Sequence, residues 1–349
     1  MKAAITGVGH FVPEGRLTNS DLEKVVDTSD EWITARTGIR ERRILDQDQG
    51  TSTMAVKAAQ MVLEQTGTRA EDLELILVAT VTPDMTVPPM AALVQHELKA
   101  VNSWGYDING ACAGFVCALA TGVQFIETGR HRKVLVIGAD KMSAIVNYGD
   151  RNTCVLFGDA AGAVLLEPAR ENETGIEDVE VHLDGSGKDF LFMEGGGSLH
   201  PASEETVAKE MHYIFQDGKA VFKQAVTRMA DVSASILKRN GLQGCDVKLL
   251  IPHQANQRII DAVTARLKLN REQVVINIEK YGNTTAATIP LAMSEAYRSG
   301  RMDKGDRIVL SAFGAGYTWG SILLRWALPR EAVPDNDVET VADYQELAN

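Results

Sequence analysis

The sequence predicts an α/β fold made of two related halves, and three features of the chain carry this prediction. Short apolar runs alternate with longer amphipathic stretches, one order of elements occurs twice, and the composition is that of a globular protein. Hydrophobic residues make up 45% and charged residues 23% of the 349 positions, close to ordinary globular values. A long disordered chain is therefore excluded, and the length suits two domains or one large two-part core.

Four apolar runs have the length of strands that are buried on both faces: residues 73–81, 133–138, 247–251 and 307–312. Four amphipathic stretches with a helical period lie among them: residues 52–65, 113–128, 219–240 and 286–299. Residues 1–9 are expected to add a short strand. Apolar strands separated by helices are typical of sheets that carry helices on both faces.

The repeat is the most informative of these features. Residues 106–109 lead through Cys112 into a predicted helix, and residues 275–278 lead through Asn283 into another. Cys112 precedes Gly129 by the same number of residues as Asn283 precedes Gly300. Each glycine is expected to end the predicted helix, and an apolar strand follows in both copies. We therefore expect Cys112 and Asn283 in related strand-to-helix turns of two copies of one unit.

His253 follows an apolar strand of the second copy. In open α/β sheets, functional groups gather beyond the carboxyl ends of the strands. A duplicated sheet with pseudo-twofold symmetry would bring Cys112, His253 and Asn283 together at the centre of the molecule.

The polar stretch 168–178 is expected to connect the halves, which gives an N-terminal half over residues 1–170 and a C-terminal half over residues 171–329. Residues 184–205 are rich in Gly and Ser, and we expect them to loop over the surface. Residues 330–349 are acidic and lack an apolar pattern, so we interpret them as a C-terminal extension.

Charge and cysteine usage restrict the class of protein. A net charge of −12 argues against a general nucleic-acid binder. No apolar run reaches the roughly 20 residues of a membrane helix, and the N-terminus lacks the pattern of a signal peptide. The four cysteines, at 112, 117, 154 and 245, form no CxxC pair, so zinc-ribbon and thioredoxin interpretations fail. We expect a cytoplasmic protein with free thiols.

Cys112 has the setting of a nucleophile. Small residues surround it in the segment Asn-Gly-Ala-Cys-Ala-Gly-Phe, so the backbone can turn sharply and a substrate can approach. A helix is expected to begin here, and its positive N-terminal end would stabilise a thiolate. Cysteine suits thioester exchange, because the attacking and the leaving atom are both sulfur. We interpret the other three cysteines as structural.

The other two candidates are ambiguous when each is taken alone. A histidine at a strand end, as His253 is, can be a buried structural residue, and Asn283 is also well suited to cap the helix that follows it. Their expected proximity to Cys112 favours a catalytic role for both. Among glycine-rich segments, residues 7–9 lack the pattern of a dinucleotide site. The tight turn expected at residues 313–316 could present a backbone N–H to an oxyanion.

Five motifs make the chain resemble a known family. They are Asp-Glu-Trp-Ile-Thr-Ala-Arg-Thr-Gly-Ile at 30–39, Ala-Cys-Ala-Gly at 111–114, Phe-Gly-Asp-Ala-Ala-Gly at 157–162, Pro-His-Gln-Ala-Asn at 252–256 and Tyr-Gly-Asn-Thr-Thr at 281–285. Over roughly residues 1–328 the chain resembles the β-ketoacyl-acyl carrier protein synthase III family, the initiating condensing enzymes of type II fatty acid synthesis. The resemblance implies a thiolase-like fold with a five-layered αβαβα core. Related elongating synthases have Cys-His-His and thiolases Cys-His-Cys, so Asn283 marks the decarboxylating, priming class.

The resemblance also implies a mechanism. Cys112 would take a short acyl group from acyl-CoA. His253 and Asn283 would bind the thioester oxygen of malonyl-acyl carrier protein and stabilise the enolate that loss of CO2 leaves. The N–H groups of Cys112 and Ala315 would form the oxyanion hole. No metal or redox cofactor is implied, and the expected assembly is a homodimer.

The resemblance also implies substrate and carrier-protein contacts for individual residues of this chain. The residues expected to contact CoA are Thr28, Trp32, Arg36, Arg151, Ala255, Asn256 and Phe313. Trp32 and Arg151 are expected to hold the adenine between them, by stacking and a cation–π contact. Arg258 and Arg266 are expected to form a local basic patch for acidic acyl carrier protein.

Two positions depart from the family pattern. Ala315 stands where the family often has Gly, which weakens its assignment to the oxyanion hole because its backbone is less free. Val87 stands where some members carry a larger aromatic residue that reaches the acyl pocket of the partner. The smaller side chain predicts a pocket that admits longer or branched primers.

Three alternatives stay open at this point. A specialised-metabolite acyltransferase would keep the same three residues on the same scaffold but change the acceptor. A cysteine hydrolase would use Cys, His and Asn to transfer the acyl group to water, without dependence on malonyl substrates. A non-catalytic scaffold would retain only the fold. The hydrolase leaves the repeated turns unexplained, and the scaffold leaves the three intact residues unexplained.

Overall fold

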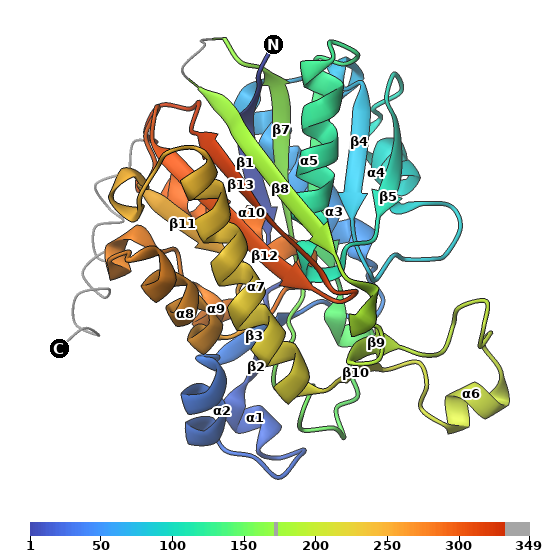
Figure 1. Cartoon of the computed structure of the whole chain (residues 1–349). Coiled ribbons are helices and arrows are strands. Elements are labelled where there is room, and N and C mark those ends of the chain that lie inside the picture. Colours follow the sequence, from blue (N-terminus) through green and yellow to red (C-terminus); the bar gives the residue numbers. More distant parts are fainter. Residues whose placement is uncertain (171–173, 332–349) are drawn as a thin grey trace.

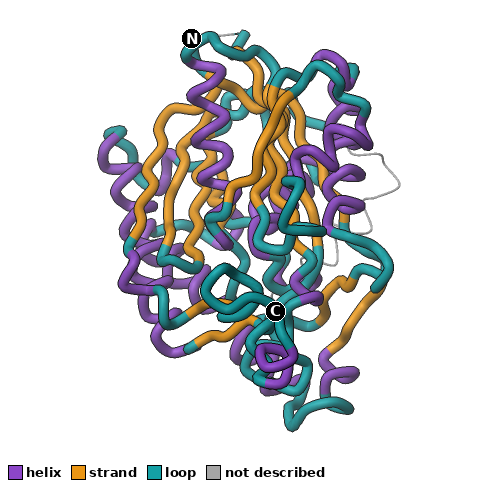
Figure 2. Tube along the Cα trace, turned by 90° about the vertical axis from the view of Figure 1, so that its right-hand side faces the viewer, coloured by secondary structure: helices purple, strands orange, loops and turns teal. Residues whose placement is uncertain are grey.

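The structure is a computed structural model that describes residues 1–170 and 174–331. From residue 332 on, the C-terminal extension predicted for residues 330–349 lies outside the described residues. Two main sheets form the body of the molecule, and a layer of helices lies between them (Figures 1 and 2).

The first sheet has the strand order β1-β7-β6-β4-β5. Its strands are β1 (Ala3–Phe11), β7 (Ala160–Pro168), β6 (Val134–Asp140), β4 (Leu75–Ala79) and β5 (Trp104–Ile108). The pairs β1–β7 and β7–β6 are antiparallel, whereas β6–β4 and β4–β5 are parallel. The predicted strands 1–9, 73–81 and 133–138 are thus confirmed.

The second sheet repeats this pattern. Its order is β8-β13-β12-β11, with β8 (Gly175–Leu183), β13 (Thr318–Arg325), β12 (Arg307–Gly314) and β11 (Leu249–Pro252). The first two pairs are again antiparallel and the third is parallel. The expected fifth strand near residues 275–278 is reduced to one parallel bridge between Leu250 and Val274, because the short helix α9 (Ile278–Tyr281) begins soon after it.

Six helices complete a five-layered αβαβα body. On the outer face of the first sheet lie α3 (Thr51–Thr66) and α4 (Met90–Leu98), and on that of the second lie α7 (Gly218–Arg239) and α8 (Gln257–Leu267). The central layer consists of α5 (Gly114–Glu127) and α10 (Thr288–Arg298), each in contact with strands of both sheets (Figure 1). The fold predicted from the resemblance is confirmed.

The largest core cluster surrounds this central layer. Phe115 and Leu119 from the first half pack in one cluster with Ile289, Met293 and Trp326 from the second. Both central helices are apolar around most of their surface, as a helix enclosed by two sheets must be. The two sheets therefore share one core across the middle of the molecule.

The smaller elements lie toward the end of the molecule that holds the carboxyl ends of the central strands. They are β2 (Gly15–Thr18), α1 (Asn19–Leu22), α2 (Asp30–Thr37), β3 (Glu41–Ile44), β9 (Leu191–Met193), α6 (Glu204–Ala208) and β10 (Ile214–Gln216). Short 3₁₀ helices are η1 (Ala70–Asp72), η2 (Ala111–Ala113), η3 (Met142–Ala144), η4 (Gly185–Gly187), η5 (Gly244–Asp246), η6 (Arg271–Gln273) and η7 (Thr285–Ala287). The segment with β9, α6 and β10 extends from the body as an arm (Figure 1).

Two loop predictions need correction. The stretch 168–178 is only partly a connection, because β8 starts at Gly175 and pairs with β13. The stretch 184–205 is not all loop, because it contains β9, which pairs with β10, and it reaches the start of α6. Both strands gain their partners from distant segments, which a local Gly and Ser pattern does not reveal. The division into residues 1–170 and 171–329 stays a prediction.

The repeat itself is confirmed, but its alignment shifts by three residues. Leu75 lies opposite Val134 in the first half, and Leu249 lies opposite Ile308 in the second. When the two halves are aligned so that these two pairs coincide, Asn109 rather than Cys112 is equivalent to Asn283, and Cys112 is equivalent to Ala286. Backbone conformation agrees, since Ala111 and Thr285 each open a 3₁₀ turn at a left-handed φ, of 47° and 52°.

The reason for the shift is helix length. Helix α5 has 14 residues and α10 has 11, so the glycines after their ends are displaced relative to the starts. The sheets fix the starts of the helices, whereas the glycines follow the ends. Alignment on the glycines therefore located both turns but matched them to each other with a shift of three residues.

Candidate active site

Cys112 lies in the turn that joins β5 to α5. The chain leaves β5 at Ile108, passes Gly110 and enters η2, which runs directly into α5. A side chain at Gly110 would meet the backbone of Gly114 at 2.9 Å, so this turn requires glycine there. The Cys112 side chain is 8% exposed and lines a cavity.

His253 directly follows β11, and its N–H donates to the carbonyl oxygen of Ser311 at 2.7 Å. This bond extends the hydrogen-bond ladder between β11 and β12 by one residue. It thereby fixes the backbone position from which the His253 imidazole extends. The residue is 1% exposed, and burial lowers the pKa of the imidazole to about 3. Nδ1 has no hydrogen-bond partner among the described residues. The ring is therefore neutral at physiological pH and retains capacity to exchange a proton.

Both backbone groups of Asn283, its N–H and its carbonyl, make hydrogen bonds that hold the residue in place. Its N–H donates to the Leu156 carbonyl at 2.9 Å, and its carbonyl accepts from the Gly158 N–H at 3.1 Å. The side-chain Oδ1 accepts from the Thr285 N–H at 3.0 Å, as in a capping residue. With Oδ1 engaged in the turn, the amide Nδ2 donors are the part of the side chain left for a ligand. Capping and ligand binding are thus compatible.

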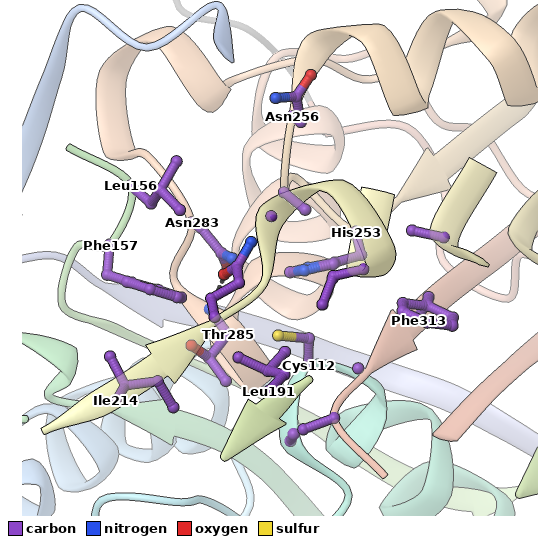
Figure 3. A pocket seen from close by; sticks show the side chains of 18 of the residues that line it. Cys112, Leu156, Phe157, Leu191, Ile214, His253, Asn256, Asn283, Thr285 and Phe313 are labelled. Carbon is purple, nitrogen blue, oxygen red and sulfur yellow. Dashed lines mark hydrogen bonds between the residues drawn. The ribbon is translucent and has the colours of Figure 1, made fainter. Parts of the chain in front are cut away.

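The three residues line one cavity of about 1010 Å³, together with Thr285 (Figure 3). They come from three separate segments, at the end of β5, at the end of β11 and ahead of α10. Figure 3 shows the Cys112 sulfur, the His253 ring and the Asn283 carboxamide turned toward the same space. The convergence expected from the repeat is what the structure displays, although the pairing of equivalent turns differs.

The thiol of Cys112 is not activated in the way the helix start suggests. Burial raises its pKa to about 12, and the nearby charge of Asp140 adds to the rise. Asn283 and Thr285 lie close enough to oppose the shift, but the Thr285 hydroxyl makes no hydrogen bond among the described residues, so its effect is that of a polar contact. The expectation of a stabilised thiolate was wrong, because burial removes the water that would stabilise a charged sulfur.

The segment after β12 packs against the nucleophile turn. A Cβ placed on Gly314 would lie 2.6 Å from the Cys112 nitrogen and 2.9 Å from the Ala113 nitrogen. Ala315 follows directly and lines the cavity, as does Phe313, which is 4% exposed and contacts the Tyr317 ring at 5.0 Å. The end of β12 thus lies directly against the backbone of the nucleophile turn.

The mouth of the cavity carries Trp32 and Arg36. Two guanidinium groups stack on the Trp32 indole, those of Arg36 and Arg151, each 4.5 Å from the ring centre. The adenine expected between Trp32 and Arg151 has no room in this arrangement, so Arg151 must move outward before a base can enter. Its exposed contact with Asp27, at 3.5 Å, is weak enough to allow this. Thr28 is half-buried near the mouth but does not line the cavity.

Asn256 and Ala255 line the cavity, yet the Asn256 side chain is already engaged. Its Oδ1 caps α8 by accepting from the Arg258 N–H at 2.9 Å, and its Nδ2 donates to the Arg36 carbonyl at 2.9 Å. Asn256 thus ties α8 to the segment at the mouth. A ligand that used its amide would have to replace the bond to Arg36.

The two basic residues of α8 differ in position. Arg258 lines the cavity and lies over the Phe222 ring at 4.9 Å, whereas Arg266 is exposed and pairs with Asp231 at 3.3 Å. Val87 is 80% exposed and does not line the cavity of its own chain. Arg258 thus belongs to the lining of the cavity, and the other two residues do not.

Comparison with known proteins follows the same outline. Two models described as 3-oxoacyl-[acyl-carrier-protein] synthase III match the chain, one over residues 106–185 and its C-terminal counterpart over residues 237–326. The β-ketoacyl-[acyl-carrier-protein] synthase III of Chlorobium chlorochromatii is 54% identical over 328 residues, which cover 93% of this chain and 100% of the relative. The chain belongs to the 3-oxoacyl-[acyl-carrier-protein] synthase III family. The corresponding protein of Koribacter versatilis is 52% identical over 327 residues, covering 93% of this chain and 98% of its own.

Solved structures of the synthase III family share the fold. That of the Aquifex aeolicus enzyme is 44% identical with a TM-score of 0.85, covering 93% of this chain and 100% of the other. That of Pseudomonas aeruginosa is 39% identical with a TM-score of 0.86, covering 96% and 100%. The priming β-ketosynthase of the R1128 polyketide pathway is 33% identical with a TM-score of 0.87, covering 94% and 97%.

Sequence reasoning missed Thr285 and most of the apolar lining of this synthase III cavity. Thr285 is 2% exposed and stands in the predicted motif, but its neighbours in sequence gave no sign that it faces Cys112. The missed apolar side chains come from several elements: Met142, Leu156, Phe157, Leu191, Ile214, Phe222 and Met229. Their common feature is spatial, so no spacing in the chain could have identified them.

Two further findings bear on the class of protein. Within residues 1–170 and 174–331, no helix combines the length and apolar character needed to cross a membrane. The same residues contain no group of three or more His, Cys, Asp and Glu side chains arranged to hold a metal ion.

Proposed function

We propose that this protein condenses a short acyl-CoA with malonyl-acyl carrier protein and thereby initiates type II fatty acid synthesis. The observation that carries the proposal is the convergence of Cys112, His253 and Asn283 on one cavity with an apolar lining. The relatives that match nearly the whole chain are named β-ketoacyl-[acyl-carrier-protein] synthase III, and the names agree with this chemistry.

The first half-reaction transfers the acyl group to Cys112. With the pKa of the thiol near 12 and that of His253 near 3, both groups are uncharged when substrate arrives. The sulfur attacks the thioester carbonyl as its proton passes to His253. His253 then returns the proton to the departing CoA thiolate. One carbon–sulfur bond forms and one breaks, so the step is balanced and nearly neutral in energy.

The second half-reaction uses malonyl-acyl carrier protein. The malonyl carboxylate leaves as CO2, and its electron pair becomes an enolate on the thioester oxygen. An N–H of neutral His253 and the Nδ2 of Asn283 donate to that oxygen, and the buried site strengthens both bonds. The enolate carbon attacks the acyl-Cys112 carbonyl, with the N–H groups of Cys112 and Ala315 as the oxyanion hole. The Cys112 thiolate departs and regains its thiol form by taking up one proton from solvent, so that each condensation consumes one proton.

No step of this scheme calls on a metal or a redox cofactor, since decarboxylation drives the condensation. We assign the CoA nucleotide to the mouth, with Thr28, Trp32, Arg36 and Arg151, and the pantetheine arm to the cavity past Ala255, Asn256 and Phe313. Arg258 is the better candidate of the two arginines for acyl carrier protein, because it lines the cavity whereas Arg266 does not and is paired with Asp231.

We also propose a cytoplasmic homodimer. Strand β5 is an edge of the first sheet, and Val101, Trp104 and Val87 are 69%, 50% and 80% exposed. An unpaired edge strand flanked by apolar side chains is suited to pair with a second copy. The four cysteines are all free, as expected in a reducing compartment.

The test is a two-stage labelling experiment. The protein is incubated with labelled acetyl-CoA, the acylated residue is identified by peptide mass spectrometry, and malonyl-acyl carrier protein is then added. We expect label on Cys112 that moves into a β-ketoacyl product. The Cys112→Ser variant should carry no thioester, and Cys117→Ser serves as the matched control that keeps it. Thioester label that Cys112→Ser still holds, or label that never reaches a β-ketoacyl product, would refute the proposal.

A second candidate is a specialised-metabolite acyltransferase on the same scaffold. The similarity to the priming β-ketosynthase of the R1128 polyketide pathway supports it, although the identity of 33% is lower than for the synthase III relatives. Preference for malonyl-acyl carrier protein with acetyl-CoA favours the first function. Activity confined to another acceptor or donor favours the second.

Val87 gives a prediction about the primer. Because Val is smaller than the aromatic residue of some family members, we expect this protein to accept isobutyryl-CoA in competition with acetyl-CoA. Replacement Val87→Phe should shift the ratio of the two products toward acetyl by at least about threefold, since a pocket discriminates a few methyl groups by 1–3 kcal/mol. Strict acetyl preference in the unaltered protein would refute the prediction.

A further inference from the structure

Asp140, the last residue of β6, is a carboxylate with no exposed surface. Its Oδ1 accepts from the Thr80 hydroxyl at 3.0 Å, the Val81 N–H at 2.7 Å and the Thr82 hydroxyl at 2.9 Å. The Thr82 N–H adds a longer bond at 3.2 Å. These donors all belong to the segment that follows β4.

The other oxygen of Asp140 reaches the second half of the molecule. Oδ2 accepts from the Ala286 N–H at 3.0 Å, across 146 positions in the chain. Ala286 lies in η7, one residue after Thr285 and three after Asn283. The carboxylate therefore holds the turn of the second half, which carries two groups of the candidate site, against the end of a strand of the first half.

The duplicated fold shows what is special about this position. Asp140 and Gly314 end the equivalent strands β6 and β12, and Ala286 and Cys112 occupy equivalent turns. In the second copy of the turn a carboxylate binds the backbone N–H. In the first copy the equivalent N–H, that of Cys112, faces a glycine with no side chain. The carboxylate is thus present at the turn of Ala286, which must be fixed, and absent at the turn of Cys112, whose N–H must stay available.

Among the described residues, few charged groups surround Asp140 and the Cys112 thiol. The Cys112 thiol faces His253, which is neutral, and the uncharged Asn283 and Thr285, and Asp140 is the charged group that acts on it. Lys141, next in the chain, points away and donates its Nζ to the carbonyl oxygens of Asp46 and Gln49, at 2.7 and 2.6 Å. Burial raises the pKa of Asp140 to about 6, so the carboxyl is ionised at pH 7 and above.

We propose that Asp140 is a positioning residue of the condensing site: its bond to Ala286 holds the Asn283–Thr285 turn in place, and its negative charge adds to the effect of burial in disfavouring a Cys112 thiolate. This inference rests on the proposed function for the identity of the reaction, but the arrangement it describes involves this chain alone. The thiol form protects the sulfur from adventitious electrophiles while the turn keeps the enolate-binding donors aligned.

The test compares Asp140→Asn with Asp159→Asn. Asp159 is a second buried carboxylate, one position before the residue that pairs with Asp140, bonded to Ser143 and to the Leu45 N–H, and it is not among the main causes of the pKa shift of Cys112. Two quantities are measured: the rate of Cys112 alkylation by iodoacetamide from pH 6 to 10, and kcat and KM for condensation.

For Asp140→Asn we expect alkylation at pH 8 to be three- to tenfold faster, because removal of a like charge lowers the pKa of the thiol by about half a unit to one unit. We expect kcat to fall by about tenfold while KM for acetyl-CoA stays within threefold. Asp159→Asn should leave the alkylation rate within twofold of the unaltered protein. A purely structural role for Asp140 predicts no change in the pH dependence of alkylation.

If Asp140→Asn shows either alkylation or kcat within twofold of the unaltered protein, the inference is overturned. If that variant does not fold, Thr80→Val removes one donor and leaves the carboxyl. Because the charged carboxylate stays, it should lower kcat by a smaller factor and leave alkylation within twofold, and an unchanged kcat overturns the inference. Since alkylation needs no substrate, the alkylation result stands apart from failure of the unaltered protein to condense, which would instead refute the proposed function.

Discussion

At the scale of single residues, burial shifts the pKa values of two groups of the candidate site in opposite directions. Burial raises the pKa of the Cys112 thiol to about 12 and lowers that of His253 to about 3. The pair is therefore a neutral thiol and a neutral imidazole, not the thiolate and imidazolium of cysteine proteases. A neutral imidazole keeps an N–H that can donate to an enolate oxygen and a lone pair that can accept the thiol proton, which are the two roles that the proposed mechanism gives to His253.

The pKa of His253 leads to a prediction about stability. In the unfolded chain the imidazole takes up a proton below about pH 6.5, whereas in the folded protein it does so only near pH 3. Folding is therefore penalised as pH falls below 6.5, by about 2 kcal/mol at pH 5. The variant His253→Gln lacks this penalty, so its stability relative to the unaltered protein should rise by about 2 kcal/mol between pH 7.5 and pH 5.

Urea unfolding at both pH values measures the effect. His96→Gln, which changes an exposed histidine on α4, is the control and should show no comparable difference. An equal stability difference for His253→Gln at the two pH values would mean that the buried ring does take up a proton in the folded state.

At the scale of elements, the sequence predicted what depends on local pattern. Apolar runs located the central strands, and the repeat located the two turns and the strand end that carry Cys112, Asn283 and His253. The residue spacing could not reveal the bond from Asp140 to Ala286, which spans 146 positions, or the pairing of β9 with β10. Those contacts arise only when distant segments pack, and the same is true of Thr285 facing the sulfur.

Burial also decided a question that local pattern answered wrongly. The start of α5 near Cys112 suggested a stabilised thiolate, because a helix N-terminus is positive. The sequence contains no measure of how completely the fold removes water from that turn. Once Cys112 is 8% exposed, with Asp140 nearby, the environment reverses the expected direction of the pKa.

The contact between β12 and η2 gives a prediction at this scale. In Gly314→Ala the new Cβ would lie 2.6 Å from the Cys112 nitrogen, which backbone cannot accommodate without moving. We expect a loss of about 1–3 kcal/mol in stability, as for other overpacked sites, and a fall of at least about tenfold in the rate of acyl transfer from acetyl-CoA.

Mass spectrometry of the acylated protein over time gives that rate. Gly197→Ala is the matched control, because a Cβ there meets nothing within 4 Å, and it should acylate within twofold of the unaltered protein. Normal acylation by Gly314→Ala would show that the nucleophile turn can shift without cost to its chemistry.

At the scale of the whole molecule, the duplication explains why the site lies where it does. Each half contributes a sheet, and the carboxyl ends of the central strands and the starts of the two central helices face one another at the pseudo-twofold axis. The copies have then diverged: one turn carries the sulfur and an available N–H, and the other carries the amide and a backbone fixed by Asp140. One half alone holds only part of the candidate site.

The shared central layer leads to the last prediction, which concerns the proposed division into residues 1–170 and 171–329. Helices α5 and α10 each contact both sheets, and one core cluster joins apolar residues of the two halves. Separation of the halves would expose that entire layer, so they should unfold together in one transition. Hydrogen exchange in increasing urea, followed by mass spectrometry, should give the same midpoint for peptides covering β6 and β12. Midpoints that differ by more than about 1 M, roughly 1–3 kcal/mol of local stability, would show that each half is stable without the other and that the central layer is an interface between independent domains.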